Sequence, residues 1–339
     1  MEPAVAVGYA ATDEALRTAA QFGINNIVVY SGPGSSPPLD YQAYVALRMR
    51  IESFGLKLVA IEGGFSPQRR FYDVIFGGPK QDELIEELLQ GVRAMGRAGI
   101  PIWGYNWMPN SWGRGKPTTV RGGAFATGYQ YDWENERRPP TLPGQTITEK
   151  QMWDALEYWI KAVTPVAEEE GIRCGIHPED PPVPQRGGIP GLFRNFAAFK
   201  RLIEIYPSDY NAIEFCQGTL SEMPGEDIYE MIEYFASRKK VLYVHFRNVS
   251  GKAPEFNEEF INTGYVDMKR AMRTYRDAGY TGTFIDDHCP NMDDDTVFPG
   301  NMGGYRSRLF AQGYIQGLIE SVTKEVGYGG PVGAEGGGR

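Results

Sequence analysis

The sequence predicts a closed (β/α)8 barrel, or TIM barrel, with a long lid-like insertion after the fourth strand. Short β-branched or aromatic runs alternate with longer amphipathic runs along the whole chain, which is typical of repeated βαβ units. Links from helix to strand are short, whereas links from strand to helix are long. This asymmetry favours a closed barrel over an open doubly wound sheet.

Eight apolar runs are the predicted strands: residues 5–9, 26–31, 56–62, 101–107, 173–177, 212–216, 241–249 and 283–287. Helical patterns lie between them and after the last: residues 12–22, 41–54, 81–98, 149–170, 192–205, 227–237, 266–278 and 305–326. Several of these patterns stop at a glycine, as in AAQFG, MGRAG, AEEEG and YRDAG. Glycine readily takes the left-handed conformation of a helix C-terminus, so each glycine marks a corner from helix to strand.

One segment is too long to be a bare connection. Residues 108–148, rich in Gly, Pro, Trp, Tyr and Arg, follow the fourth strand. We predict a single barrel domain over residues 1–326 in which this segment forms a lid or substrate-facing insertion; a second domain is the alternative. The glycine-rich residues 327–339 are predicted to be a disordered tail.

The composition narrows the class of protein. Among 339 residues, 42% are hydrophobic and 23% are charged, which is typical of a globular domain with a large core. The formal charge of -9 and the pI near 5.1 argue against nucleic-acid binding. No leader-like N-terminus or membrane-length apolar run is present, so we expect a cytoplasmic protein that does not bind membranes. Three scattered cysteines favour free thiols or a metal ligand over a disulfide framework.

Four side chains suited to metal binding fall at the C-terminal ends of consecutive predicted strands. His177, Cys216, His245 and Asp287 end the fifth to eighth strands, and these ends meet at one rim of a barrel. Two imidazoles, a thiolate and a carboxylate are a sensible set for a divalent ion. Independent core residues have no reason to align at equivalent strand ends. We therefore predict a metal site.

Further candidates surround this predicted site. Arg247 shares a strand face with His245 and is predicted to bind a substrate carboxylate, with a salt bridge at the barrel mouth as the alternative. His288 is a candidate for proton transfer, or else a loop histidine at the strand end. Other predicted substrate-binding residues are Glu62, Tyr105, Asn106 and Arg114. The roles of Glu179, Asp180 and Glu214 stay open.

The motifs around these residues resemble the mannonate dehydratase family, which belongs to the xylose-isomerase-like barrels. They are YNWMPN at 105–110, GIHPEDPP at 175–182, FCQGT at 215–219, HFRNV at 245–249, and the Asp287-His288 pair followed by GGY. The resemblance covers most of the chain. It implies a Mn²⁺-type ion held by the four residues proposed above, with Fe²⁺, Co²⁺ or Zn²⁺ as alternatives. It also implies catalytic roles for His288 and a downstream tyrosine, for which Tyr305 is the candidate, and a homo-oligomer, dimer or tetramer.

Two departures from the family pattern concern the substrate. The run Asp-Trp-Thr-Arg-Thr of the family is here S-W-G-R-G at 111–115, in which Arg114 matches the arginine. The terminal Pro-Asp-His-Gly-His is here D-D-H-C-P at 286–290, without a second histidine. Both changes leave the predicted metal ligands intact, so the type of reaction is better defined than the identity of the sugar.

The resemblance implies a lyase, more exactly a hydro-lyase, that eliminates water from D-mannonate or a related aldonate to give a 2-keto-3-deoxy sugar acid. A divalent ion and an arginine suit this reaction because they stabilise the charge that forms when the proton beside the carboxylate leaves. A sugar isomerase or epimerase is the alternative, although such relatives commonly use more carboxylate ligands. A noncatalytic sugar-binding barrel is a third reading. A multi-zinc phosphodiesterase is disfavoured because the chain has three histidines.

Overall fold

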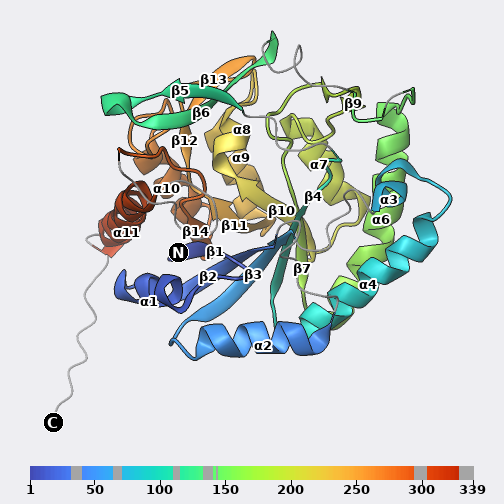
Figure 1. The fold of residues 1–339 in the computed structure, drawn as a ribbon, viewed down its shortest axis with the longest axis horizontal. Helices are drawn as coiled ribbons and strands as arrows, with labels where there is room; N and C mark the ends of the chain where they lie inside the picture. The colour runs from blue at the N-terminus through green and yellow to red at the C-terminus, as the bar shows by residue number, and fades with distance from the viewer. Residues whose placement is uncertain are drawn as a thin grey trace.

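The computed structural model describes residues 1–31, 40–63, 71–109, 115–132, 140–142, 144–293 and 304–327. Within this part of the chain, eight parallel strands close into a barrel in the order β1-β14-β11-β10-β7-β4-β3-β2 (Figure 1). The strands are β1 (Glu2–Gly8), β2 (Asn26–Ser31), β3 (Lys57–Gly63), β4 (Ile102–Asn106), β7 (Arg173–His177), β10 (Asn211–Cys216), β11 (Val241–His245) and β14 (Thr283–Ile285). The predicted fold class is confirmed.

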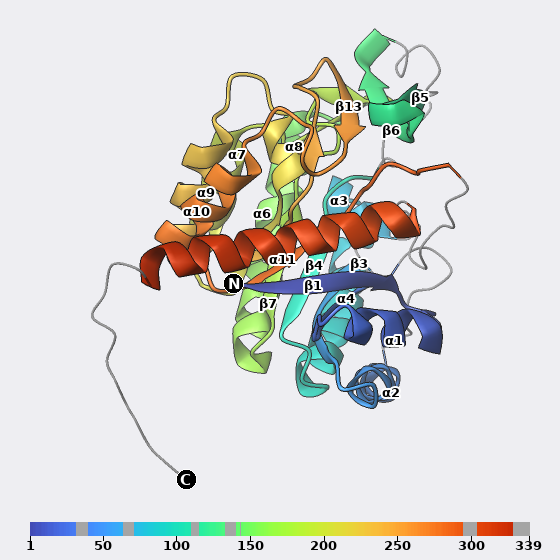
Figure 2. The same cartoon turned by 90° about the vertical axis from the view of Figure 1, so that its left-hand side faces the viewer.

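Helices cover the outside of the barrel (Figures 1 and 2). The longer ones are α1 (Asp13–Gln21), α2 (Tyr41–Glu52), α4 (Gln81–Arg97), α6 (Glu149–Glu170), α7 (Phe196–Ile205), α9 (Ile228–Ser237), α10 (Met268–Asp277) and α11 (Tyr305–Gly327). Shorter ones are α3 (Tyr72–Phe76), α8 (Gln217–Ser221) and a 3-10 turn at Arg121–Gly123. All eight helical patterns of the sequence correspond to helices in this described part.

The ends of these helices follow local sequence. Helix α6 begins with a capping box between Thr148 and Gln151, and it ends at Gly171, whose φ of 68° is left-handed. Helix α7 begins later than predicted because the side chain of Asn195 accepts a hydrogen bond from Ala198 N at 2.9 Å. The predicted strand 241–249 is also interrupted. It consists of β11 and a separate β12 (Asn248–Val249), which leaves the barrel.

The predicted insertion contributes to a second sheet beside the C-terminal end of the barrel. It contains β5 (Lys116–Thr119) and β6 (Phe125–Gln130). Strand β6 pairs antiparallel with β13 (Glu255–Glu259) from the connection that follows β11, giving the order β12-β13-β6-β5 (strands labelled in Figure 1). A short hairpin of β8 (Gln185–Arg186) and β9 (Ile189–Pro190) follows β7. A lid function for 108–148 stays a prediction, and the predicted tail beyond residue 327 lies outside the described residues.

The strands divide their side chains between the barrel interior and the helix layer. Small apolar residues such as Ala4, Ala6, Val28 and Ala60 fill the interior, where space is limited. The larger core lies between strands and helices, and it includes Trp103 of β4 and Trp159 of α6. In the described part of the chain, no helix is both long and apolar enough to cross a bilayer.

Candidate metal centre and active site

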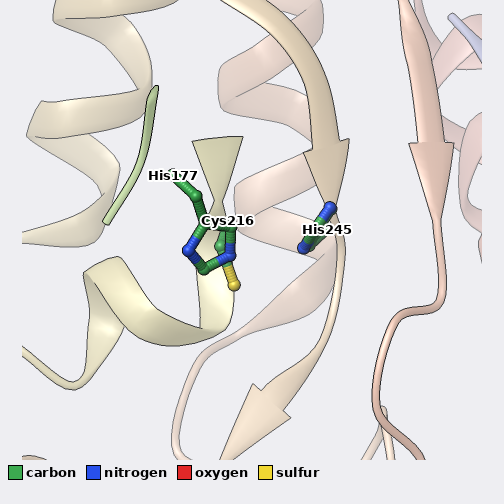
Figure 3. Close-up of side chains that lie close together, drawn as sticks. All are labelled: His177, Cys216 and His245. Carbon is green, nitrogen blue, oxygen red and sulfur yellow. The ribbon is translucent and has the colours of Figure 1, made fainter. Parts of the chain in front are cut away.

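The structure brings the four predicted metal ligands together at the C-terminal end of the barrel. One donor atom each from His177, Cys216 and His245 lies within 4.8 Å of the other two (Figure 3). Asp287 completes the group, because its Oδ2 is 3.4 Å from His245 Nδ1 and 3.9 Å from Cys216 Sγ. All four side chains are buried. Strand register explains the meeting, since Cys216 pairs directly with His245 across β10 and β11.

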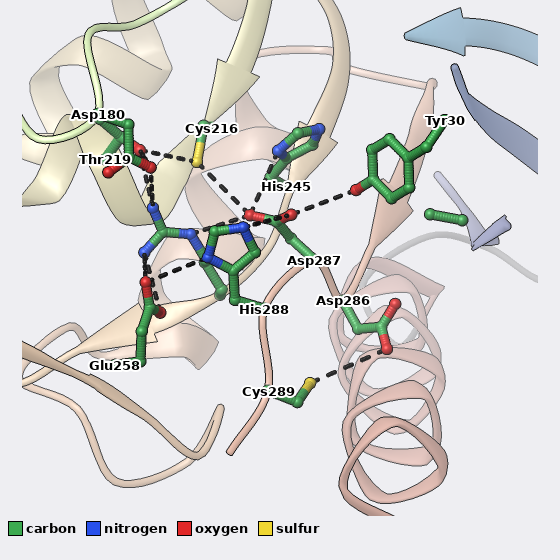
Figure 4. Close-up of polar contacts among 12 residues, drawn as sticks. Tyr30, Asp180, Cys216, Thr219, His245, Glu258, Asp286, Asp287, His288 and Cys289 are labelled. Carbon is green, nitrogen blue, oxygen red and sulfur yellow. Dashed lines mark hydrogen bonds and ion pairs between the residues drawn. The ribbon is translucent and has the colours of Figure 1, made fainter. Parts of the chain in front are cut away.

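Local sequence orients two of these ligands. Pro178 has no N–H, so the pairing of β7 ends at His177. The carbonyl of Pro178 accepts a hydrogen bond from His177 Nδ1 at 2.7 Å, which leaves Nε2 for the cluster. Asp287 has a left-handed φ of 52°, a conformation that aspartate tolerates better than most residues. Its carboxylate points toward Cys216 and His245 (Figure 4).

The surroundings of His245 fit a bound cation. Its Nε2 lies 3.1 Å from Glu62 Oε2 and 3.4 Å from Glu214 Oε1. Carboxylates accept hydrogen bonds, so Nε2 is the donor to Glu62. Burial alone would lower the pKa of His245, but Asp287 and Glu62 raise it, so a bound cation would displace a proton from Nδ1. That Nδ1 is buried and makes no hydrogen bond to any described residue, and the acceptor Oδ2 of Asp287 faces it. A cation between them satisfies both atoms, and a carboxylate behind a ligating histidine is the usual arrangement at metal sites.

The electrostatics of the cluster favour a thiolate at Cys216. Burial alone would raise the pKa of Cys216, but the Arg247 guanidinium and the nearby imidazoles of His177 and His245 lower it to about 5. Burial alone would lower the pKa of His177, whereas the neighbouring Cys216 and Glu214 raise it to about 9. The Cys216 thiolate is therefore already formed when a cation binds, whereas His177 must lose a proton to become a ligand.

Arg247 is held by the protein itself. Its Nε donates to Asp287 Oδ2 at 3.0 Å. Its terminal nitrogens donate to four further groups, which are Glu222 at 3.0 Å, Glu258 at 3.2 Å, Asp180 at 3.1 Å and Thr219 at 2.8 Å. The side chain is 1% exposed. Because every nitrogen is already engaged, we withdraw the predicted contact between Arg247 and a substrate carboxylate.

The other predicted substrate-binding residues differ in position. Glu62 contacts the cluster through its hydrogen bond with His245, and Asn106 of β4 pairs in register with His177. Tyr105 points the other way: its ring stacks on Trp103 at 4.5 Å between centroids and its hydroxyl accepts from Trp159 Nε1 at 2.9 Å. Side chains alternate along a strand, so Tyr105 packs in the helix layer, which is a correction to its predicted role. Arg114 lies outside the described residues.

Of the two predicted catalytic residues, the structure brings His288 to the cluster. Its Nε2 is 3.4 Å from Asp287 Oδ1, and its Nδ1 is 3.2 Å from Glu258 Oε1. Tyr305 is the first residue of α11, and its ring lies 6.3 Å from that of Phe22 beside α1. This contact packs one side of the Tyr305 ring against the residue that ends α1.

Sequence reasoning missed Thr219, Tyr30 and Glu258, which touch the ligands or His288; the Thr219 hydroxyl donates to Cys216 Sγ at 3.1 Å. Tyr30 is the second-last residue of β2, and its hydroxyl donates to Asp287 Oδ1 at 3.2 Å. Glu62 was identified because it lies near the C-terminal end of a strand, and the same argument could have identified Tyr30. Glu258 lies on β13, outside the barrel, and no motif marks it. Its contact with His288 depends on how the second sheet folds back over the barrel.

Glu214 is a buried carboxylate beside the predicted metal ligands, and its effect on metal affinity can be tested. It is fully buried, neither carboxylate oxygen has a hydrogen-bond partner among the described residues, and Oε1 is 4.0 Å from His177 Nε2. Burial and the Glu62 charge raise its pKa. We expect Glu214→Gln to weaken metal affinity roughly 10–100-fold, because it removes a carboxylate whose Oε1 lies 3.4 Å from the non-ligating Nε2 of His245. Competition with a chelator measures this, with the exposed Glu233→Gln as control; equal affinities of both variants would refute the prediction.

A closed parallel barrel with buried histidine, cysteine, histidine and aspartate at its C-terminal end defines a (β/α)8 protein whose side chains could hold a metal ion. The family described as D-mannonate dehydratase (UxuA) matches residues 14–142 and 140–327 of the sequence. The chain belongs to the D-mannonate dehydratase family, and the resemblance seen in its motifs is confirmed.

Individual relatives agree with this assignment. The chain is 31% identical over 335 residues to a mannonate dehydratase of Streptococcus pneumoniae (strain 70585), covering 90% of this chain and 89% of the relative. It is 30% identical over 305 residues to mannonate dehydratase 2 of Halalkalibacterium halodurans, covering 82% and 86%. The crystal structure of mannonate dehydratase from Streptococcus suis serotype 2 superposes with a TM-score of 0.87 at 27% identity, covering 100% and 99%. An L-ribulose 3-epimerase, at 15% identity and a TM-score of 0.58, shares the fold alone.

Proposed function

We propose that this chain is a metal-dependent hydro-lyase that eliminates water from D-mannonate, or from a closely related aldonate, to give a 2-keto-3-deoxy sugar acid. The observation that carries the proposal is the buried set of His177, Cys216, His245 and Asp287 in a barrel of this family. The relatives named mannonate dehydratase support the substrate class.

Mn²⁺ is the proposed ion, with Fe²⁺, Co²⁺ and Zn²⁺ as alternatives, because the mixed nitrogen, sulfur and oxygen donors suit several divalent ions. Bound at the four ligands, a divalent ion supplies Lewis-acid stabilisation of negative charge on the substrate. A homo-oligomer, dimer or tetramer, and a cytoplasmic location stay part of the proposal.

The elimination removes a proton from the carbon beside the carboxylate and a hydroxyl group from the next carbon. His288 is the proposed proton-transfer residue, since its Nε2 lies beside the metal-ligand carboxylate of Asp287. Tyr305 stays the predicted second proton-transfer residue. Tyr30 is an additional candidate because its hydroxyl already lies 3.2 Å from Asp287 Oδ1. Arg114 stays a predicted substrate-binding residue, and it is the proposed partner of the substrate carboxylate because Arg247 is engaged by the protein.

Turnover of a panel of aldonates, uronates and keto-sugars tests this proposal. We expect metal-loaded protein to form a 2-keto-3-deoxy acid from D-mannonate or a related aldonate, and chelated protein to form none. Direct detection of 2-keto-3-deoxy products measures the reaction. Reversible interconversion of sugars without loss of water would contradict the dehydratase and would favour an isomerase or epimerase.

A further inference from the structure

A buried carboxylate lies directly behind His288. Oε1 of Glu258 is 3.2 Å from His288 Nδ1, and the two side chains are visible together in Figure 4. The Glu258 side chain is 2% exposed, whereas that of His288 is 27% exposed. The His288 side chain is thus partly exposed to solvent, whereas the Glu258 carboxylate behind it is buried.

Glu258 is itself held firmly in place. Both of its carboxylate oxygens accept from Arg247 Nη1 at 3.2 Å. Its strand, β13, pairs with β12 on one side and with β6 on the other, so the backbone is fixed as well. The same guanidinium donates to Asp287 Oδ2 at 3.0 Å. One arginine therefore links the metal-ligand carboxylate to the carboxylate behind His288.

We propose that Glu258 is a positioning residue that keeps a proton on Nδ1 of His288 and directs Nε2 toward the substrate. Glu258 Oε1 is an acceptor only and lies within hydrogen-bond distance of Nδ1, at 3.2 Å, so Nδ1 is the nitrogen that donates to it, whereas the oxygen nearest to Nε2, Asp287 Oδ1, already accepts from the Tyr30 hydroxyl. Nε2 then faces Asp287 Oδ1 at 3.4 Å, on the side of the metal ligands. An orienting carboxylate behind a catalytic histidine selects its tautomer in the same way in hydrolases.

The catalytic part of this inference rests on the proposed function and is tested by kinetics. Glu258→Leu removes every acceptor, and Glu258→Gln keeps one neutral acceptor. We expect kcat to fall on the order of 10²-fold in Glu258→Leu and less in Glu258→Gln, with KM within about twofold and the metal retained. The neighbouring Glu259→Leu, whose side chain instead accepts from Thr263 Oγ1 at 2.9 Å, is the matched control and should match the wild type.

A double variant separates positioning from a general loss of structure. If Glu258 acts through His288, Glu258→Leu should slow the reaction no further once His288→Gln is present. Independent, multiplying losses in kcat would overturn the proposal, and so would loss of the metal from both Glu258→Leu and Glu258→Gln.

A second measurement needs no turnover. The chain has three histidines, so ¹⁵N-histidine labelling of the Zn²⁺-loaded protein gives three pairs of ring signals, and His288→Gln assigns one pair. We expect Nδ1 of His288 to be protonated in the wild type and to lose that proton in favour of Nε2 in Glu258→Leu. An unchanged Nδ1 signal would overturn the proposal. If no substrate of the panel reacts, the proposed function fails, while this signal still decides the role of Glu258.

Discussion

Replacing His177 or Cys216 with alanine should remove the bound metal and almost all dehydratase activity. Both donor atoms belong to the cluster in which three side chains lie within 4.8 Å of one another. Loss of one donor leaves an incomplete set, and the Lewis-acid contribution of the ion is several kcal/mol, which corresponds to a fall in kcat of roughly 10³-fold or more. Elemental analysis of the purified variants measures metal per chain, and steady-state kinetics measures kcat.

The chain supplies a matched control for this experiment. Cys174 is also buried, but it lies near the N-terminal end of β7, and its Sγ is directed at Ile172 O at 3.8 Å. Cys174→Ala makes the same chemical change outside the cluster, so it should keep the metal and the activity. Unchanged metal stoichiometry in both His177→Ala and Cys216→Ala would refute the site.

The fold and the metal ligands could be predicted because they depend on periodic features of the sequence. A parallel barrel places every strand end at one rim, so knowing where His177, Cys216 and His245 end their strands was enough to bring them together. The boundaries of β2 and β7 follow from the apolar runs at 26–31 and 173–177. No knowledge of side-chain packing was needed for these inferences.

Tyr105 shows a mistake that alternation could have prevented. Gly104 faces the barrel interior, because a Cβ there would lie 2.2 Å from Glu214 Oε2 and 2.4 Å from the Tyr243 hydroxyl. Its neighbours Trp103 and Tyr105 must then face the helices. The sequence places two large aromatic residues around a glycine, which is the pattern of a strand with a crowded interior and a packed outer face.

The partners of Arg247 could not be predicted in the same way. Its carboxylates belong to four separate connections that follow β7, β10, β11 and β14, namely Asp180, Glu222, Glu258 and Asp287. Their pairing depends on how these connections fold over the rim, and no periodic feature of a single sequence records it. An arginine near a metal site is therefore easily taken for a substrate ligand when its protein partners are unknown.

Arg247→Met should destabilise the protein strongly, by about 3–5 kcal/mol, because it leaves several buried carboxylates without their cation. The site is built around this side chain: a Cβ at Gly218 would lie 2.4 Å from the Arg247 Cζ, so the chain passes directly against the guanidinium. Arg247→Lys should recover only part of the loss, since one ammonium cannot match the fork that reaches Asp180, Glu258 and Asp287. Urea denaturation followed by circular dichroism measures the change in the free energy of unfolding.

The measurement has to separate this effect from metal binding, because a bound ion stabilises the folded state by mass action. Each variant is therefore compared with the wild type in chelated protein, where only the loss of charge pairing contributes. Arg273→Met is the control: that arginine is exposed and pairs with Glu325 on the surface, so its removal should change the urea midpoint little. If chelated Arg247→Met unfolded at the same urea concentration as Arg273→Met, the carboxylates around Arg247 would not depend on its charge. The arginine would then be free for the substrate contact that its position first suggested.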